Sequence, residues 1–279
     1  MRNVKSRGTG TVLAVVCGVA VLLLAATSPT PAEEGPRTLL AVFAHPDDEQ
    51  VISPMLARYA REGVRVHVAF ATDGRKGVRE HAGIPAGEAL AAARAEEARC
   101  ACERLGVRPP VLVGLEDGAL YKEESKAALL EEIARLFAEL EPDVVVTWGP
   151  DGVTGHTDHR LVSSLVTQVV QRGEPSTSPR LFYAGLSAER RSALGDLTGP
   201  AGRGVPREIA VVRDRYLPVR ISYGREDAEA ARGSLACHKS QYTPEELARM
   251  SEMARLLEDG AVRLRPWFVD PGPVEDVFE

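Results

Sequence analysis

The chain has 279 residues, of which 44% are hydrophobic and 27% are charged, so it can form a substantial buried core. Its formal net charge is −6 and no basic cluster is present, which excludes nucleic acid as an expected partner. Roughly 245 residues remain once the N-terminal segment is set aside, which suits one α/β domain better than two small ones.

Residues 1–32 have the pattern of a secretory signal peptide. Basic residues come first, a nearly continuous apolar run covers Thr11 to Ala26, and small residues and prolines follow. The run is short for a membrane span of about 20 residues, but an uncleaved N-terminal anchor remains the alternative. Both alternatives place the expected folded domain, residues 33–279, outside the cytoplasmic membrane, so the protein is expected to be secreted or extracytoplasmic, with a membrane-anchored form as the alternative to cleavage.

Apolar runs and helical patterns alternate through the first two thirds of this domain. Strands are expected at residues 38–44, 64–71, 111–115, 143–148 and 181–184. Helices are expected at about 50–62, 88–105, 123–140 and 161–171, with Gly106 as a C-terminal cap. Because the strands read as continuous apolar runs separated by helices, the sequence predicts an α/β fold with a mostly parallel sheet and helices on both faces.

The last third of the chain is less regular. Residues 187–206 are rich in Gly, Arg, Ser and Pro, which predicts a loop or insertion. Residues 208–212 and 216–222 resemble a late pair of strands, and 226–237 and 244–258 resemble helices.

Three cysteines lie beyond the N-terminal segment, so they cannot all be paired within one chain. Cys100 and Cys102 are two positions apart on an expected helix and do not share a face, so a metal site built on that pair is not expected. They read as small buried apolar residues, and one bridge to Cys237 remains possible.

Ionisable residues follow each of the first four strands. They are His45, Asp47 and Asp48, then Asp73, then Asp117, and finally His156, Asp158 and His159. Pro46 lacks a backbone donor and turns the chain after the first strand. Because the carboxyl ends of parallel strands meet at one edge, we expect these side chains to converge there. Such a density of charge beside an apolar strand is costly unless a cation binds.

A metal site is the chemistry that these loops support. His45 and Asp48 are three positions apart across a turn, and the fourth loop adds His156 and His159. Two histidines and one carboxylate are the ligands of a catalytic zinc site, and equally the facial triad of non-haem iron. The sequence therefore predicts a metal and leaves its identity open.

A hydrolytic metal site also needs a base and a donor for the developing oxyanion. Asp47 suits the base and a protonated His156 suits the donor, although a structural histidine is the alternative for His156. Asp158 is expected either to hold an imidazole in its working tautomer or to cap a helix that starts at His159.

The string Ala44-His45-Pro46-Asp47-Asp48-Glu49, followed by Gly155-His156-Thr157-Asp158-His159, resembles the PIG-L (LmbE-like) deacetylase family. The resemblance extends over most of residues 38–242. It implies a Rossmann-like fold in a single domain and a zinc-dependent hydrolase with one Zn²⁺ per chain. The expected substrate is a small molecule or glycoconjugate that carries an N-acetylated amino sugar such as N-acetylglucosamine.

The resemblance also assigns roles to matching positions. It implies that His45, Asp48 and His159 hold the metal, that Asp47 is the general base, and that His156 stabilises the oxyanion. It places near the sugar Arg94 with Glu97, Asp117 with Gly118, and the segment that begins at His238. The alternative is a solvated helix face for Arg94, a turn residue for Asp117 and an ordinary helix end for the segment at His238.

The sequence departs from the usual family pattern in one loop and at one further residue. Residues 72–77 read T-D-G-R-K-G where relatives more often carry T-x-G-E, so this loop is expected to affect which substrate is accepted. Thr157 stands where proline is more common.

Two other functions remain alternatives, a non-haem iron oxygenase with the same ligands and a non-catalytic sugar-binding module. The oligomeric state is left open.

Overall fold

The computed structural model describes residues 35–173, 179–188, 211–256, 260–268 and 275–278. The expected signal peptide or anchor and most of the expected insertion at 187–206 lie outside these ranges. Residues from Gly35 onward form one compact unit. Within the described ranges, no helix combines the length and the apolar character needed to cross a membrane.

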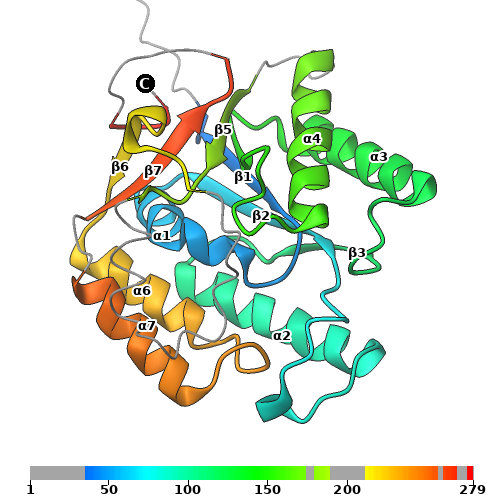
Figure 1. The fold of residues 1–279 in the computed structure, drawn as a ribbon. Coiled ribbons are helices and arrows are strands. Elements are labelled where there is room, and N and C mark those ends of the chain that lie inside the picture. The colour runs from blue at the N-terminus through cyan, green and yellow to red at the C-terminus, as the bar shows by residue number, and fades with distance from the viewer. Residues whose placement is uncertain (1–34, 174–178, 189–210, 257–259, 269–274, 279) are drawn as a thin grey trace, which may run out of the picture. The chain divides into compact units, whose positions relative to one another are not determined.

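A seven-stranded sheet forms the centre of this unit (Figure 1). Its strands are β1 (Thr38–Phe43), β2 (Arg65–Thr72), β3 (Val111–Leu115), β4 (Val144–Trp148), β5 (Arg180–Ala184), β6 (Val219–Ser222) and β7 (Ala261–Pro266). They are ordered β3-β2-β1-β4-β5-β7-β6. The first five strands pair in parallel, and β7 runs antiparallel to both β5 and β6. The predicted α/β class with a mostly parallel sheet is confirmed.

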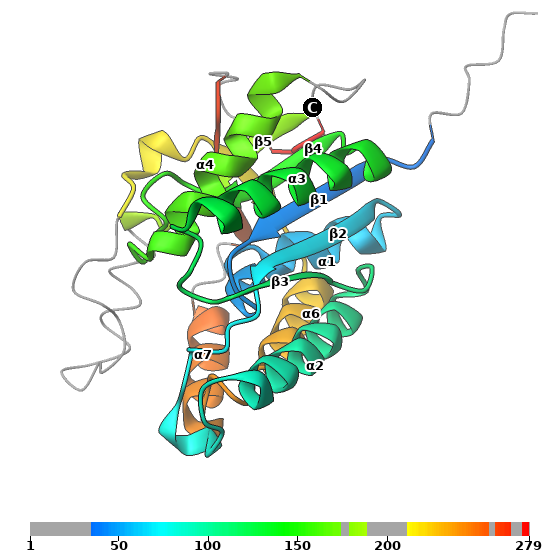
Figure 2. The ribbon, with the colours of Figure 1, turned by 90° about the vertical axis from the view of Figure 1, so that its right-hand side faces the viewer.

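Helices cover both faces of the sheet (Figure 2). They are α1 (Ser53–Arg61), α2 (Glu88–Leu105), α3 (Glu123–Leu140) and α4 (Thr157–Arg172); α6 (Arg225–Leu235) packs on α1 and α2, and α7 (Pro244–Leu256) packs on α6. Alternate residues of β1 point to opposite faces. Leu40 and Val42 pack with the core under α3 and α4, whereas Leu39 and Phe43 pack with the core under α1 and α2. Every residue of β1 and β4 is buried, which explains why both strands are apolar apart from Thr38 and Thr147.

Several boundaries differ from those expected. Of the expected late strand pair, residues 208–210 lie outside the described ranges, and Val212 makes an isolated bridge with Ser187. The strand expected at 216–222 is shortened to β6, and its partner is β7, which the sequence pattern did not single out. Arginines alternate with buried apolar residues in β7, so it lacks the continuous apolar run of the parallel strands.

The structure contains one disulfide among the described residues. A disulfide joins Cys100 on α2 to Cys237 just after α6, and Cys102 is a buried free thiol. The single bridge left open by the sequence is therefore present.

The strand order creates a switch point between β1 and β4. From β1 the chain continues to β2 on one side, while β4 pairs with β1 on the other side. Helical connections diverge at such a point and leave a crevice at the carboxyl ends of the two strands. The loops that begin at His45 and at Gly149 leave the sheet there.

Candidate metal centre and active site

The loop after β1 is a tight turn in an uncommon conformation. Asp47 has φ 106° and ψ −15°, in a region that residues other than glycine rarely adopt. Its amide donates to Glu49 Oε2 at 3.0 Å, and the amide of Asp48 donates to the carbonyl of His45 at 3.2 Å. A 3₁₀ turn over Asp48–Val51 follows. Such backbone strain persists only where surrounding contacts hold it, and it is concentrated at functional sites.

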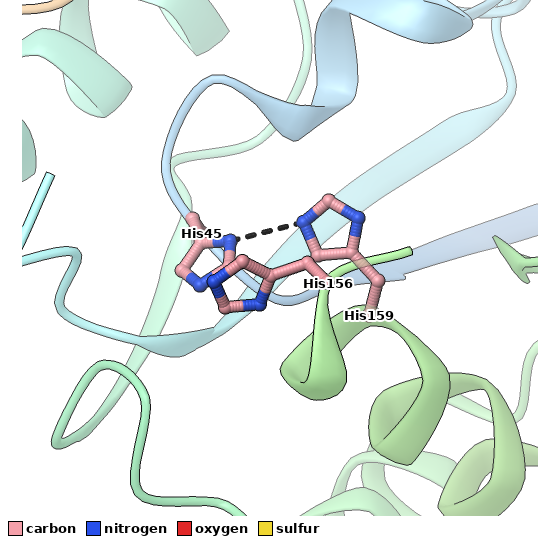
Figure 3. Close-up of side chains that lie close together, drawn as sticks. All are labelled: His45, His156 and His159. Atoms are coloured by element: carbon pink, nitrogen blue, oxygen red, sulfur yellow. Dashed lines mark hydrogen bonds between the residues drawn. The ribbon is translucent and has the colours of Figure 1, made fainter. Parts of the chain in front are cut away.

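Three potential ligand groups, two imidazoles and one carboxylate, form a triangle at the switch point. His45 Nδ1 lies 3.1 Å from His159 Nε2, a contact drawn as the dashed line in Figure 3, and 3.5 Å from Asp48 Oδ2. His159 Nε2 lies 3.4 Å from Asp48 Oδ1. Ligand atoms on a tetrahedral zinc ion with bonds of about 2.0–2.2 Å lie about 3.3–3.6 Å apart. The triangle therefore fits the donor set that the sequence predicted.

The surroundings of His159 direct one nitrogen toward this triangle. Its Nδ1 lies 2.9 Å from the carbonyl oxygen of Gly152. A carbonyl can only accept, so Nδ1 carries the proton and the Nε2 lone pair faces His45 and Asp48. Trp148 stacks on the ring at 4.5 Å between centroids and donates from Nε1 to Asp48 Oδ2 at 3.3 Å. One tryptophan thus fixes two members of the triangle.

His45 is oriented in a similar way by two carboxylates. Its Nε2 lies 3.3 Å from Asp117 Oδ1 and 3.5 Å from Asp158 Oδ2, without a well-aligned hydrogen bond to either. Both carboxylates also accept backbone N–H groups, Asp117 from Lys76 at 3.0 Å and Asp158 from Gly118 at 2.7 Å. These acceptors favour a proton on Nε2 and leave Nδ1 free to bind a metal.

Two further groupings of possible ligands share His45. One adds His156 and His159, and the other adds Asp117 and Asp158. In the second grouping both carboxylates face His45 Nε2, the nitrogen opposite the one in the triangle, which suits orientation of His45. The first shows that His156 stands at the rim of the same centre.

The charges of the buried groups depend on each other. Burial alone would lower the pKa of His45, but Asp117, Asp158 and Asp48 together raise it well above its usual value. Burial would raise the pKa of Asp48, but His159 and His45 hold it well below its usual value. Burial likewise opposes the charge of Asp117, yet His45 lowers its pKa to about 2. The carboxylates are therefore ionised and require a positive neighbour, which protons on the imidazoles or a bound cation can supply.

Asp47 lies beside the triangle and is held by a buried arginine. Its Oδ1 is 2.8 Å from the guanidinium of Arg94, which also donates to the carbonyls of Pro46 and Gly74. Burial raises the pKa of Asp47, and the positive charge of Arg94 opposes this shift. A Cβ on Gly74 would lie 2.5 Å from the guanidinium, and one on Gly77 2.6 Å, so these glycines let the loop after β2 close over Arg94.

His156 is exposed at the start of α4. Its Nδ1 accepts the amide of Asp158 at 3.2 Å, so the neutral ring carries its proton on Nε2. Its ring centroid lies 4.7 Å from that of His45 and 5.2 Å from that of His159. Partial desolvation of the ring and the neighbouring imidazoles lower the pKa of His156, which favours a neutral donor where the sequence suggested a protonated one.

The expectation that Asp158 caps a helix starting at His159 is wrong. The helix begins at Thr157, and His156 is its N-cap. Asp158 is fully buried and faces His45 and the amide of Gly118 instead.

The other residues that the sequence placed at the site contact the groups around the triangle rather than forming part of it. Arg94 contacts Asp47, and Asp117 contacts His45, as described above. His238 is fully buried and lies 2.7 Å from Glu49 Oε1, while Glu97 accepts the amide and hydroxyl of Ser240. The contacts of Arg94, Asp117 and His238 with a sugar stay predictions. Asp73, expected at the same edge, pairs with Arg75 at 2.6 Å.

Sequence reasoning missed the roles of Trp148, the Gly152 carbonyl and Glu49. The available signals were a tryptophan at the end of an apolar strand, a glycine-rich loop and the last residue of the 44–49 string. None of these signals specifies a partner, because the contacts range from 2 positions (Glu49 with the Asp47 amide) and 7 positions (Gly152 with His159) to 189 positions (Glu49 with His238).

Comparisons with known proteins point to one family. The family model described as PIG-L: GlcNAc-PI de-N-acetylase matches residues 40–170. The 1D-myo-inositol 2-acetamido-2-deoxy-alpha-D-glucopyranoside deacetylase of Rhodococcus jostii (strain RHA1) is 31% identical over 241 residues, covering 74% of this chain and 82% of that protein.

Solved structures show the same fold. The N,N'-diacetylchitobiose deacetylase from Pyrococcus horikoshii aligns with a TM-score of 0.59 and 18% identity over 84% of each chain. The zinc-inhibited form of teicoplanin deacetylase Orf2 aligns with a TM-score of 0.57 and 16% identity, covering 82% of this chain and 97% of that one.

Proposed function

The chain belongs to the PIG-L family, and from this premise we propose that it is a zinc-dependent de-N-acetylase of an N-acetylglucosamine conjugate. The enzyme class is a hydrolase acting on an amide C–N bond. Members similar in sequence deacetylate a glucosaminide of inositol, which makes a related small glycoconjugate the substrate class to test first.

One observation carries the proposal. His45 Nδ1, the Asp48 carboxylate and His159 Nε2 form a triangle with edges of 3.1–3.5 Å; the His156 ring lies 4.7 Å from that of His45, and Asp47 is the chain neighbour of Asp48. The donor set and spacing support one zinc ion per chain, held by these three residues. A bound zinc supplies a Lewis acid and lowers the pKa of coordinated water toward neutrality.

The base of the proposed reaction is Asp47. Its carboxylate takes a proton from the attacking water as the new C–O bond forms at the acetyl carbon. Arg94 keeps this carboxylate in place at 2.8 Å. Asp47 then returns the proton to the amide nitrogen as the C–N bond breaks, and acetate and the free amine leave.

The donor is His156. Negative charge develops on the acetyl oxygen as water attacks, and the Nε2–H of the neutral ring donates to it. In this scheme Asp117 and Asp158 act through His45, which they orient.

We place this reaction outside the cytoplasmic membrane. The basic and apolar N-terminal sequence supports export, and the Cys100–Cys237 disulfide suits an oxidising compartment.

The rival functions lack a supporting observation. An iron oxygenase uses the same ligands but gives Asp47 and His156 no role. A sugar-binding module needs neither the ligand triangle nor a base beside it.

The test uses the chain from Gly35 onward, loaded with zinc. N-acetylglucosamine compounds, from the monosaccharide to inositol and lipid conjugates, are incubated with it, and acetate release is measured. We expect release by the wild type and a loss of at least about 100-fold in Asp47→Asn, since general base catalysis contributes about 10²–10⁴. Glu132→Gln, which alters a carboxylate on α3 that pairs with Arg135, is the control. Wild-type turnover in Asp47→Asn would remove the base from the scheme.

A further inference from the structure

A buried pair of ionisable side chains lies directly behind the catalytic turn. Glu49 and His238 have no exposed surface, and His238 Nε2 lies 2.7 Å from Glu49 Oε1. They are 189 positions apart, on the loop after β1 and on the segment after α6. The triangle of candidate ligands uses neither side chain.

The second oxygen of Glu49 reaches the backbone of the proposed base. Glu49 Oε2 accepts the amide of Asp47 at 3.0 Å. Asp47 is the residue with φ 106°, so this hydrogen bond is made to the strained position itself. Gln50 Nε2 donates to Glu49 Oε1 at 2.7 Å and to Ser234 Oγ at 2.9 Å, which fixes the carboxylate from a second side.

His238 is itself anchored on α2. Its neighbour Cys237 is bonded to Cys100, and Ser240 donates from its amide and hydroxyl to Glu97 at 2.6 and 2.7 Å. With no exposed surface, the imidazole has no direct path to a substrate. Its contact with Glu49 instead links α2 to the turn that carries Asp47.

We infer that Glu49 and His238 are positioning residues, which hold the backbone of Asp47 in the conformation that aims its carboxylate. This inference rests on the proposed function, because it assigns Asp47 as the base. It replaces a sugar contact of His238 with an action through Glu49 and the Asp47 amide.

The first test measures kcat, KM and bound zinc in the full chain for His238→Leu and His238→Gln. Leucine removes the donor to Glu49, whereas glutamine can restore it. We expect kcat to fall about 10- to 100-fold in His238→Leu with KM and zinc content unchanged, because small misplacements of a catalytic group cost that much. His238→Gln should recover most of the loss. His67→Leu, a half-buried histidine near the start of β2, is the matched control.

Three results would overturn the inference. They are an unchanged kcat in His238→Leu, a rise in KM alone, which would indicate a sugar contact, and a loss of bound zinc, which would assign the pair to the metal centre.

A second test does not depend on turnover, so failure of the inference and failure of the proposed function are distinguishable. Amide hydrogen exchange is followed by mass spectrometry on the peptide covering residues 44–52. We expect faster exchange in His238→Leu than in the wild type and in His67→Leu, because the Asp47 amide loses its fixed acceptor. Equal exchange in all three proteins would contradict the inference even if no substrate were found. A wild type that releases no acetate, with the expected exchange difference, would count against the proposed function alone.

Discussion

Arg94 is the residue whose surroundings differ most from what its sequence position suggests. It lies on a helix rich in alanine and charged residues, where a solvated side chain is common, yet it is only 3% exposed. Its guanidinium contacts Asp47 Oδ1 and the carbonyls of Pro46 and Gly74. A buried charge requires such partners, so Arg94 connects α2 and the loop after β2 to the proposed base.

Replacement of Arg94 by methionine should lower kcat about 10- to 100-fold, because Asp47 loses the contact that places its carboxylate. Steady-state kinetics with zinc content measured in parallel would check this. Arg99→Met on the same helix, where the arginine is exposed and pairs with Glu96, is the control and should be neutral. A large rise in KM with kcat unchanged would instead support the sugar contact implied by the family resemblance.

At this scale the sequence predicted which residue types gather, but only part of how they contact one another. The 44–49 string and the 155–159 string both lie at the candidate centre. The contacts of Arg94 with Asp47 and of Glu49 with His238 join segments 47 and 189 positions apart. No local pattern encodes such a pairing.

Among the elements, α6 is fixed at its start by one buried carboxylate. Asp227 accepts Arg61 Nε at 2.9 Å and Nη2 at 3.1 Å, and also the amide of Gly224 at 2.8 Å. Burial opposes its charge, but Arg61 holds the pKa of Asp227 below its usual value. Because α6 leads directly to Cys237 and His238, its placement matters to the segment behind the catalytic turn.

Asp227→Asn should lower the free energy of unfolding at neutral pH by about 1–3 kcal/mol, because it removes a charged acceptor. A depressed pKa stabilises the fold above the unfolded pKa, and this contribution is lost as the pH falls through the folded value. The difference from the wild type should therefore shrink below about pH 4. Urea unfolding at several pH values tests this. Glu226→Gln, an exposed neighbour 3.9 Å from Arg61, should be neutral, and a difference that persists in acid would contradict the assignment.

The disulfide links the two helices behind the site, α2 and α6. Cys100 and Cys237 are separated by 137 positions, and closing so long a loop restricts the unfolded chain strongly. Replacing both cysteines by serine should cost about 2–5 kcal/mol of unfolding free energy. Thermal unfolding with and without dithiothreitol checks the origin of the effect. The reductant should destabilise the wild type and leave the double variant unchanged. A wild type whose unfolding temperature does not change with dithiothreitol would contradict a stabilising role for the disulfide.

The sequence predicted the elements well where they were uniformly apolar or strongly helical. The five parallel strands and α1 to α4 fall close to their expected ranges. By contrast, β7 alternates Arg263 and Arg265 with buried residues and was missed. The start of α4 was also misplaced, because a histidine is an uncommon N-cap.

At the scale of the whole molecule, the strand order brings together residues that lie in separate motifs. The order β3-β2-β1-β4-β5 puts the loops after β1 and β4 next to each other, although His45 and His159 are 114 positions apart. This convergence was predictable from the alternation of strands and helices, since parallel strands share an edge. The orientation of each ring was not, because it depends on the Gly152 carbonyl, Trp148 and the carboxylates around His45.

A catalytic zinc ion is tested by acetate release from an N-acetylglucosaminyl substrate as zinc is added to metal-free protein. We expect the rate to rise in proportion to zinc and to stop rising at one equivalent per chain, and we expect no such rise in His159→Ala. A rate that is the same without zinc, or that His159→Ala retains in full, would contradict a catalytic metal centre at the switch point of this sheet.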